Sequence, residues 1–318
     1  MNGIKLLATG GALPARAVTN DELSRMVDTS DEWIASRTGI RQRYFCGEGE
    51  SALTLATAAA KQALERSGLR PGDIHCCVCA TLSNDWAAPS MACMVSAALG
   101  LEESIPALDV NAACSGFLYG IATARGLLAQ TGGRYALVVG CEQLSKLLDM
   151  TDRSTCVLFG DGGGAAVLDM GCEGEFGLVL GARGSCAIRA EGPGPVPSRV
   201  EMDGKAVFRF AVDAIPKCVH GVLAQTGLTL EDMDWVVCHQ ANERILDHCI
   251  KKLGARPGQF YKNIDRMGNT SAASIPVALN EMNEQGLLKP GQRVLCVGFG
   301  AGLTWAGTLL TVAGPAEG

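Results

Sequence analysis

An internal repeat is the feature that most restricts how this 318-residue chain can fold. The segment from Ala63 reads A-L-E-R-S-G-L-R-P-G-D-I-H-C-C-V-C-A-T, and the segment from Val222 reads V-L-A-Q-T-G-L-T-L-E-D-M-D-W-V-V-C-H-Q. In this register Cys79 matches Cys238, and in both segments a helical pattern ends in a turn that leads into an apolar strand. Such a repeat predicts two α/β halves of one topology.

The repeat continues beyond these segments. G-G-R-Y-A-L-V-V from Gly132 falls in the same register as P-G-Q-R-V-L-C-V from Pro290 when Arg134 is paired with Arg293. We therefore divide the chain into an N-terminal half, residues 1–170, and a C-terminal half, residues 171–318. Position 114 then corresponds to about position 273.

Composition excludes several classes of protein. The formal net charge is −6, whereas a protein whose main partner is nucleic acid is expected to be basic. The N-terminal residues M-N-G-I-K-L-L-A-T-G lack the apolar core of a signal peptide, and no run approaches the roughly 18 apolar residues of a membrane span. We expect a cytoplasmic protein that binds neither nucleic acid nor a membrane.

The chain has 14 cysteines, which a reducing cytoplasm keeps as thiols. The dense group His75-Cys76-Cys77-x-Cys79 raises the question of a metal site. It falls in a strand-like run, where neighbouring side chains point to opposite faces and do not converge on one ion. We expect no metal; a cysteine-rich metal or redox protein is the alternative from another class.

The stretch D-V-N-A-A-C-S-G-F-L-Y, from Asp109 to Tyr119, places Cys114 between an apolar strand and an apolar helix. Amide N–H groups and the helix dipole at a helix N-terminus favour an anion, so we expect the pKa of this thiol to be lowered. Small neighbours leave room for a substrate to approach the sulfur. We interpret Cys114 as a nucleophile; the alternative is a small buried core thiol.

Of the four histidines, His239 alone follows an apolar strand and enters a polar set, H-Q-A-N-E-R. The segment R-M-G-N-T-S-A-A-S lies where the repeat puts the counterpart of the Cys114 helix, so Asn269 lies near the start of that helix. Ligands bind at the carboxyl ends of strands in α/β sheets. We expect Cys114, His239 and Asn269 to converge across a pseudo-dyad.

These three residue types suit two chemistries. In a papain-like hydrolase the histidine is the base for the thiol, and the asparagine orients the imidazole. In a decarboxylative condensation the cysteine carries an acyl group as a thioester. A neutral histidine N–H and an asparagine amide then donate to the carbonyl oxygen of the carbanion that forms from a malonyl thioester.

Four motifs in order decide between these chemistries: D-V-N-A-A-C-S-G-F, H-Q-A-N-E-R-I, G-N-T-S-A-A-S-I-P and G-F-G-A-G-L-T-W. With D-E-W-I-A-S-R-T-G-I-R at residues 31–41, they make the chain resemble β-ketoacyl-acyl-carrier-protein synthase III nearly end to end. The resemblance implies an α/β fold of the thiolase type, with a five-layered αβαβα architecture built from two duplicated halves. It also implies an acyltransferase that initiates fatty acid biosynthesis, by a ping-pong condensation of an acyl-CoA primer with malonyl-acyl-carrier protein to give 3-oxoacyl-acyl-carrier protein.

The resemblance assigns roles residue by residue. Cys114 resembles the nucleophile that takes the acyl group from CoA, and His239 and Asn269 resemble the pair that supports decarboxylation and stabilises the enolate. The N–H groups of Cys114 and Gly302 resemble the oxyanion hole. Elongating synthases of this fold use two histidines and thiolases use a second cysteine, so Asn269 indicates the CoA-primed branch. Acyl-CoA is a substrate, and no cofactor is implied.

Two binding surfaces follow from the same resemblance. Trp33 resembles the residue that stacks on the CoA adenine, and Arg37 and Arg153 resemble its phosphate partners. The alternative for Arg153 is a solvated loop charge, and on residues alone a mixed helix face is usually just solvated. The surface that docks the acidic carrier protein is implied for Arg209, Gln240, Ala241, Asn242, Glu243, Arg244 and Lys251.

Ala88 precedes Pro89 in W-A-A-P-S, where acetyl-primed members carry a bulky aromatic residue. In the family this segment reaches across a homodimer to the acyl pocket, so a homodimer is implied. With Ala88 we expect the pocket to accept primers longer or more branched than acetyl, unless Trp86 fills the same space. The alternative within the fold is a pimeloyl-precursor or secondary-metabolite ketosynthase with a different primer.

Overall fold

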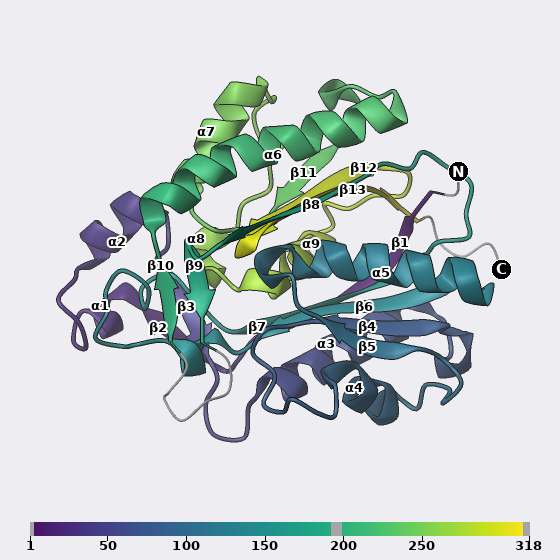
Figure 1. Cartoon of the computed structure of the whole chain (residues 1–318), viewed down its shortest axis with the longest axis horizontal. Coiled ribbons are helices and arrows are strands. Elements are labelled where there is room, and N and C mark those ends of the chain that lie inside the picture. The colour runs from purple at the N-terminus through teal and green to yellow at the C-terminus, as the bar shows by residue number, and fades with distance from the viewer. Residues whose placement is uncertain (1–2, 192–198, 314–318) are drawn as a thin grey trace.

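The structure is a computed structural model that describes residues 3–191 and 199–313. Its helices and strands stack in the layer order α, β, α, β, α. Figure 1 shows these layers from α6 and α7 at the top to α3 and α4 at the bottom. This is the five-layered architecture that the family resemblance implies, and it contains the two α/β halves that the repeat predicts.

The N-terminal half forms one sheet with the strand order β1-β7-β6-β4-β5. Within it β7 runs antiparallel to both of its neighbours, and the other pairs are parallel. The alanine-rich helix α3 and helix α4 cover its outer face, and α5 packs on its inner face. The bounds are β1 Lys5–Ala12, β4 Cys76–Ala80, β5 Ala107–Val110, β6 Tyr135–Glu142, β7 Gly162–Asp169, α3 Ala52–Ser67, α4 Met91–Leu99 and α5 Gly116–Thr131.

The C-terminal half repeats this plan with the strand order β11-β12-β13-β8. Here β13 takes the place of β7, since it runs antiparallel to both β12 and β8. A parallel bridge between Val236 and Phe260 takes the place of the β4–β5 pairing. The bounds are β8 Leu178–Ser185, β11 Trp235–Cys238, β12 Arg293–Gly300, β13 Gly302–Val312, α6 Gly204–Thr226, α7 Glu243–Leu253 and α9 Ser274–Glu284.

The two sheets meet where Lys5 and Leu6 of β1 pair with Thr311 and Val312 of β13. Within the described residues the nine strands of these two sheets therefore form one continuous sheet, with α5 and α9 between its two halves. Strand β7 ends at residue 169 and β8 begins at residue 178, but the division into domains at residue 170 stays a prediction.

The backbone sharpens the register of the repeat. The 3-10 turns η2 (Ala113–Ser115) and η5 (Ser271–Ala273) precede α5 and α9, and each begins at a non-glycine residue with positive φ, 47° at Ala113 and 48° at Ser271. An asparagine two residues earlier accepts a hydrogen bond from each of these residues. The counterpart of Cys114 is thus residue 272, one position before the residue that the sequence repeat indicates. The difference arises because the connections that lead from the strands to these two turns differ in length between the halves.

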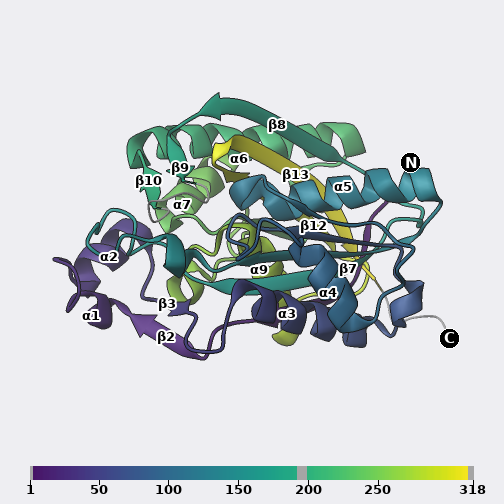
Figure 2. The same cartoon turned by 60° about the horizontal axis from the view of Figure 1, so that its bottom comes forward.

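The remaining short elements flank the ends of the sheets. Figure 2 shows that α1, α2, β2 and β3 lie together at one end of the molecule. In the described residues no helix is long and apolar enough to cross a membrane. The bounds are α1 Asn20–Leu23, α2 Asp31–Thr38, α8 Ile264–Met267, β2 Arg16–Thr19, β3 Gln42–Phe45, β9 Ile188–Ala190, β10 Val200–Met202, η1 Pro71–Asp73, η3 Leu144–Leu147 and η4 Leu230–Asp232.

The cysteines of β4 illustrate how a central strand divides its side chains between two cores. Cys76 packs in the core between the sheets, whereas Cys77 and Cys79 pack under α3 and α4. This alternation is the arrangement that the strand pattern predicts. The three thiols therefore fill two separate apolar layers.

Candidate active site

Cys114 lies in η2, between the end of β5 and the start of α5, at the predicted strand-to-helix turn. The N–H of Ala113 donates to the side chain of Asn111 at 3.2 Å, which helps to hold the turn. On the other side, a Cβ atom added to Gly300 of β12 would lie only 2.7 Å from Cys114 Cβ and 3.1 Å from its Sγ. The glycine at position 300 thus allows β12 to pass directly beside the sulfur.

The structure brings Cys114, His239 and Asn269 together, as the repeat predicts. All three line one cavity of about 120 Å³. Most of its other walls are apolar and come from both halves of the chain: Leu158, Phe159, Ile188, Met202, Val207, Phe208, Ala241, Ile245 and Phe299. A mostly apolar cavity with a few convergent polar groups is typical of a site that binds a small molecule.

The prediction of a lowered pKa for Cys114 is wrong. Burial raises the pKa of its thiol to about 12, and the nearby carboxyl of Glu142 raises it further, while the Ser271 hydroxyl and the backbone lower it. Cys114 is partly exposed to the cavity, but the cavity walls around its sulfur are mostly apolar, and such surroundings disfavour the thiolate. Burial therefore favours the thiol form of Cys114 at neutral pH, and the predicted role as a nucleophile requires that another group accept its proton.

His239 follows β11, and its backbone N–H donates to the carbonyl of Val297 at 2.8 Å. Its ring meets Phe299 edge-on, with the centroids 5.2 Å apart. Burial lowers the pKa of His239 to about 3, so the imidazole is neutral at physiological pH. A neutral imidazole carries one N–H, which is the form that the predicted role as a hydrogen-bond donor requires.

Asn269 is held in place by its backbone and its side-chain oxygen. Its N–H donates to Leu158 and its carbonyl accepts from Gly160, each at 2.9 Å. Its Oδ1 accepts from the N–H of Ser271 at 3.0 Å. Among the described residues, the Nδ2 group remains as the donor that the side chain can offer to a ligand in the cavity.

Gly302, the second predicted oxyanion-hole residue, is not among the residues that line this cavity. It lines a neighbouring cavity of about 630 Å³, together with Ala112, Ala113 and Ala301. Gly300 instead lies against Cys114. The oxyanion role of Gly302 stays a prediction.

A larger cavity of about 1120 Å³ adjoins the catalytic one, and the two share Met202, Gly204, Phe208 and Asn242 as walls. Its outer rim contains Trp33 and Arg37. The Arg37 guanidinium lies 4.6 Å from the centre of the Trp33 ring, as their spacing of four residues on α2 predicts. The two cavities thus form a path from Trp33 to Cys114.

Arg153 also lies over Trp33, with its guanidinium carbon 5.2 Å from the ring centre. Its Nη1 donates to the carbonyl of Asp28 at 2.9 Å. This placement is more specific than the solvated loop charge that the residues alone allow. Arg153 therefore lies next to the aromatic face of Trp33 at the rim of the larger cavity.

The predicted carrier-protein surface divides into exposed and buried parts. Arg209 and Arg244 are exposed at the rim of the larger cavity, and Lys251 is exposed on α7. The prediction that Gln240 lies on this surface is wrong. Its side chain is buried, with the residue 1% exposed, and its amide nitrogen donates to the carbonyls of Cys238 and Tyr261. It therefore braces the turn after β11 and is not available to a partner.

The other three residues of this set are partly buried. Ala241 lines the catalytic cavity. Asn242 caps α7 through the Arg244 N–H and donates to the Arg37 carbonyl at 3.0 Å, which ties α7 to α2. Glu243 pairs with Lys262 at 3.1 Å, so its charge is partly compensated within the chain.

Trp86 and Ala88 do not line the catalytic cavity of their own chain. Trp86 is 49% exposed, which is unusual for so large an apolar side chain, and Ala88 is exposed beside it. Their predicted place in an acyl pocket therefore requires a second subunit, and it stays a prediction.

Several cavity residues escaped the sequence analysis. Phe208 stands at the junction of the two cavities, and Lys205 lies on the rim. Both belong to the first turns of α6, after the capping residue Asp203. Their place at the cavity depends on how α6 packs beside α2 and α7, which the sequence does not show. The one signal in the sequence was the i, i+4 spacing of Lys205 and Arg209, which puts two cations on one face of a helix.

Comparisons with known proteins agree with this geometry. The family model described as 3-oxoacyl-[acyl-carrier-protein (ACP)] synthase III matches residues 108–184, and the model of its C-terminal region matches residues 223–312. The β-ketoacyl-[acyl-carrier-protein] synthase III of Clostridium beijerinckii is 43% identical over 323 residues, which cover 98% of this chain and 99% of that protein.

Solved structures give the same result. The 3-oxoacyl-(acyl carrier protein) synthase III of Pseudomonas aeruginosa PAO1 has a TM-score of 0.92 and 38% identity, over 99% of this chain and 100% of that chain. The priming β-ketosynthase of the R1128 polyketide biosynthetic pathway has a TM-score of 0.92 and 33% identity, over 99% of this chain and 97% of that chain.

The fold and the cysteine cavity thus define a condensing enzyme of the acyltransferase class. The chain belongs to the 3-oxoacyl-[acyl-carrier-protein] synthase III family. The predicted reaction class, the condensation that initiates fatty acid synthesis, is confirmed by this membership.

Proposed function

We propose that the chain transfers a short acyl group from acyl-CoA to Cys114 and then condenses it with malonyl-acyl-carrier protein. The observation that carries this proposal is the single cavity lined by Cys114, His239 and Asn269, which continues to a rim with an aromatic ring and cations. The products are 3-oxoacyl-acyl-carrier protein, CoA and carbon dioxide.

In the first half-reaction, Cys114 Sγ forms a bond to the acyl carbonyl carbon, and the bond from that carbon to the CoA sulfur breaks. CoA leaves with the proton that the Cys114 thiol held. The N–H groups of Cys114 and Gly302 are proposed to stabilise the oxyanion of the tetrahedral intermediate. Acyl-CoA is consumed as a substrate, and the proposed chemistry requires no cofactor.

In the second half-reaction, the malonyl carboxylate leaves as carbon dioxide, and its electron pair forms an enolate. A neutral His239 N–H and the Asn269 Nδ2 group are proposed to donate hydrogen bonds to the enolate oxygen. The low pKa of His239 supports this assignment, since an imidazolium would be costly in so apolar a cavity. The enolate carbon attacks the acyl carbon, and Cys114 leaves as a thiolate that takes up a proton.

The rim of the larger cavity is proposed to hold the nucleotide end of CoA. Trp33 offers an aromatic face to the adenine, and Arg37 and Arg153 lie within 4.6 and 5.2 Å of the same ring. Guanidinium groups next to an aromatic face suit a ligand that joins a purine to phosphates. From there the pantetheine arm would follow the shared walls to Cys114.

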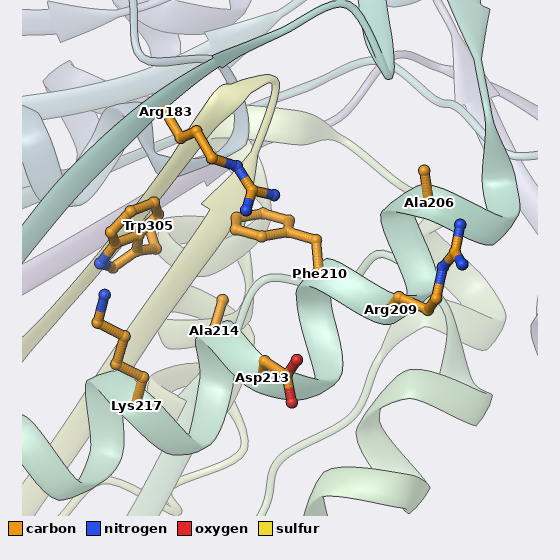
Figure 3. Close-up of a pocket in the computed structure, with 8 residues that line it drawn as sticks. All are labelled: Arg183, Ala206, Arg209, Phe210, Asp213, Ala214, Lys217 and Trp305. Carbon is orange, nitrogen blue, oxygen red and sulfur yellow. The ribbon is translucent and has the colours of Figure 1, made fainter.

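The outer face of α6 and α7 is proposed to dock the acidic carrier protein. A further cavity, beside α6, has a volume of about 420 Å³. Figure 3 shows Lys217 directed at Trp305 and Arg183 at Phe210, while Arg209 extends away from these rings. Lys217 Nζ lies 4.2 Å from the Trp305 ring. These cations stand out on a chain whose net charge is −6, and one of the residues of this cavity, Arg209, also lines the larger cavity that leads to Cys114.

Reversal of the charge at Lys251 should weaken carrier-protein binding alone. We expect Lys251→Glu to raise KM for malonyl-acyl-carrier protein about fivefold at low salt, with a smaller effect at high salt, because the interaction is between exposed charges. Steady-state kinetics at two ionic strengths measure this. Lys61→Glu, on α3 in the opposite outer layer, is the matched control. Equal KM values for the two variants would contradict the docking face.

The primer is proposed to be larger than acetyl. The cavity of about 120 Å³ exceeds what a methyl group fills, since an apolar cavity of about 150 Å³ holds a benzene molecule. Ala88 also leaves space if the partner's segment reaches this wall. The alternative of a secondary-metabolite ketosynthase has one observation in its favour, the likeness to the priming β-ketosynthase of the R1128 pathway.

Intact mass spectrometry after incubation with acetyl-, butyryl- and isobutyryl-CoA tests the proposal. We expect a mass gain equal to one acyl group, with faster labelling by the four-carbon primers than by acetyl-CoA. An exclusive preference for acetyl would contradict the primer proposal and leave the reaction intact. No adduct with any of these primers would contradict the proposed function.

A cytoplasmic homodimer is the proposed state of the protein. Strand β5 is the edge of the N-terminal half of the sheet, and its residues are only half-buried, so one row of its backbone groups is open to a second copy. The exposed Trp86 stands on the loop between the neighbouring strand β4 and α4. Pairing of two β5 strands would bring these loops close to a partner.

A further inference from the structure

A fully buried arginine outside the catalytic cavity has no role in the mechanism above. Arg43 of β3 is 0% exposed. Its Nη1 donates to the Val18 carbonyl at 3.2 Å and to Asn20 Oδ1 at 2.8 Å, and its Nη2 donates to the Val157 carbonyl at 2.7 Å. All three acceptors are neutral oxygens, and within the described residues Nε has no partner. The guanidinium thus joins the start of α1 to a segment more than a hundred residues later in the chain.

A guanidinium in this position is costly for the fold. Burial lowers the pKa of Arg43 to about 10, while the Cys156 thiol and the Asp31 carboxyl raise it, so the group is still charged at neutral pH. A buried charge costs free energy, and apolar side chains of similar volume often stabilise a core better. What an arginine adds is a planar set of hydrogen bonds in fixed directions. The question is therefore which part of the molecule those hydrogen bonds hold in place.

The Nη2 hydrogen bond of Arg43 reaches the segment that holds Asn269. The Asn269 N–H donates to the Leu158 carbonyl, and its carbonyl accepts from the Gly160 N–H, each at 2.9 Å. Residues 158 and 160 thus clamp the backbone of Asn269 from one side. Val157, whose carbonyl Arg43 holds, immediately precedes this clamp. A shift of Val157 would therefore move the backbone that places the Asn269 amide in the catalytic cavity.

Arg43 also packs against both strands of the clamp. A Cβ atom added to Gly160 would lie 2.9 Å from Arg43 Cβ, and one added to Gly268 would lie at the same distance, 2.9 Å. Real Cβ atoms essentially never come so close to another atom, so glycine at both positions is what allows the contact. Gly268 directly precedes Asn269 in the chain. The stem of Arg43 therefore touches the clamp and the segment that it clamps.

The repeat shows why this clamp needs a brace. In the C-terminal half the single residue Ala301 joins β12 to β13, whereas in the N-terminal half the connection from β6 to β7 runs from residue 143 to residue 161. A long connection has many more conformations to exclude than a one-residue turn. The residues that clamp Asn269 stand at the end of this long connection. Their position must be fixed by another element, and β3 supplies the bond through Arg43.

We propose that Arg43 is a positioning residue for Asn269, because its guanidinium fixes Val157 and thereby the clamp that places the Asn269 amide in the catalytic cavity. Arg43 is not among the described residues that line this cavity, so it acts only through others. Its effect therefore falls on condensation, the half-reaction that uses Asn269, and not on acylation of Cys114. This inference rests on the proposed acyl-enzyme and on the proposed role of Asn269 in the second half-reaction.

The variant Arg43→Lys tests the proposal. It keeps the positive charge, but one ammonium nitrogen replaces the two Nη atoms whose bonds run to different segments. We expect an acyl adduct at the wild-type rate and condensation about tenfold slower per acylated chain, since a displacement of about 1 Å can cost about 100-fold. Mass spectrometry counts the acylated chains and so corrects for misfolded protein. Arg66→Lys is the matched control, because Arg66 also donates to a backbone carbonyl, that of Thr9, and to an amide oxygen, Asn280 Oδ1. Its condensation rate should equal that of the wild type.

A double-mutant cycle separates positioning from a general loss of stability. If Arg43 acts through Asn269, Arg43→Lys should slow condensation by about twofold at most once Asn269 is already alanine. A loss of about tenfold in both backgrounds would overturn the proposal, because the effect would then not pass through Asn269. An unchanged condensation rate in Arg43→Lys would overturn it too, as would an equal loss in acylation.

Asn20→Ala carries the same test if Arg43→Lys does not fold. It removes one of the three acceptors that hold the guanidinium and leaves Arg43 itself in place. We expect condensation about threefold slower per acylated chain, the effect of one weakened hydrogen bond, and no further loss when Asn269 is alanine. Equal losses in the two backgrounds would contradict the proposal. A wild type that forms no acyl adduct would instead overturn the proposed function.

Discussion

Replacement of Cys114 by alanine is expected to abolish the acyl adduct and to lower the rate of condensation by about 10³-fold or more. Cys114 is the thiol among the described residues that lines the cavity with His239 and Asn269. Without Sγ the acyl group has no covalent carrier, and the reaction loses its division into two half-reactions. Intact mass spectrometry and a condensation assay with malonyl-acyl-carrier protein measure the two effects separately.

Cys93→Ala is the matched control for this experiment. Cys93 is an exposed free cysteine on α4, so it is the kind of thiol that would be acylated by simple accessibility. We expect the Cys93 variant to retain both the adduct and the condensation rate. An adduct that persists in Cys114→Ala and disappears in Cys93→Ala would show that the wrong sulfur has been assigned.

Replacement of His239 or Asn269 by alanine is expected to spare acylation and to lower the rate of condensation by about 100- to 1000-fold for each residue, the range for loss of one oxyanion-type donor. The structure supports separate roles. The imidazole is neutral in its buried position, and the fixed Oδ1 of Asn269 leaves Nδ2 for the enolate. Acyl-adduct formation by mass spectrometry and decarboxylation of malonyl-acyl-carrier protein are the two measurements.

His220→Ala controls for the loss of an imidazole, since His220 is exposed on α6. We expect this variant to behave as the wild type in both measurements. If His239→Ala instead failed to form the adduct, His239 would be the base for the thiol, as in a hydrolase of the papain type.

The fold was accessible from the sequence because its information is local and repeated. The turn that carries Cys114 needs only an apolar strand, small residues and an apolar helix in succession, and these stand next to one another in the chain. The repeat then placed Asn269 at the matching helix start. His239 followed from the end of its own strand. Each of these predictions depends on neighbours in sequence, and the two-fold repeat supplied the one long-range relation that was needed.

Other features depended on contacts that no local pattern encodes. Gln240 stands in a polar run that looks exposed, yet the Cys238 and Tyr261 carbonyls hold it in the interior. Gly300 approaches Cys114 only because β12 crosses beside η2.

The repeat in the sequence thus predicted two α/β halves and the three residues that line the cavity, and the resemblance to a known family added the reaction class and the five-layered fold. The sequence did not determine the protonation states on which their chemistry depends. The helix-start position of Cys114 predicts a lowered pKa, whereas burial raises it to about 12. Only the tertiary structure decided this, because the cost of burying a charge depends on every atom that surrounds it, and those atoms come from both halves of the chain.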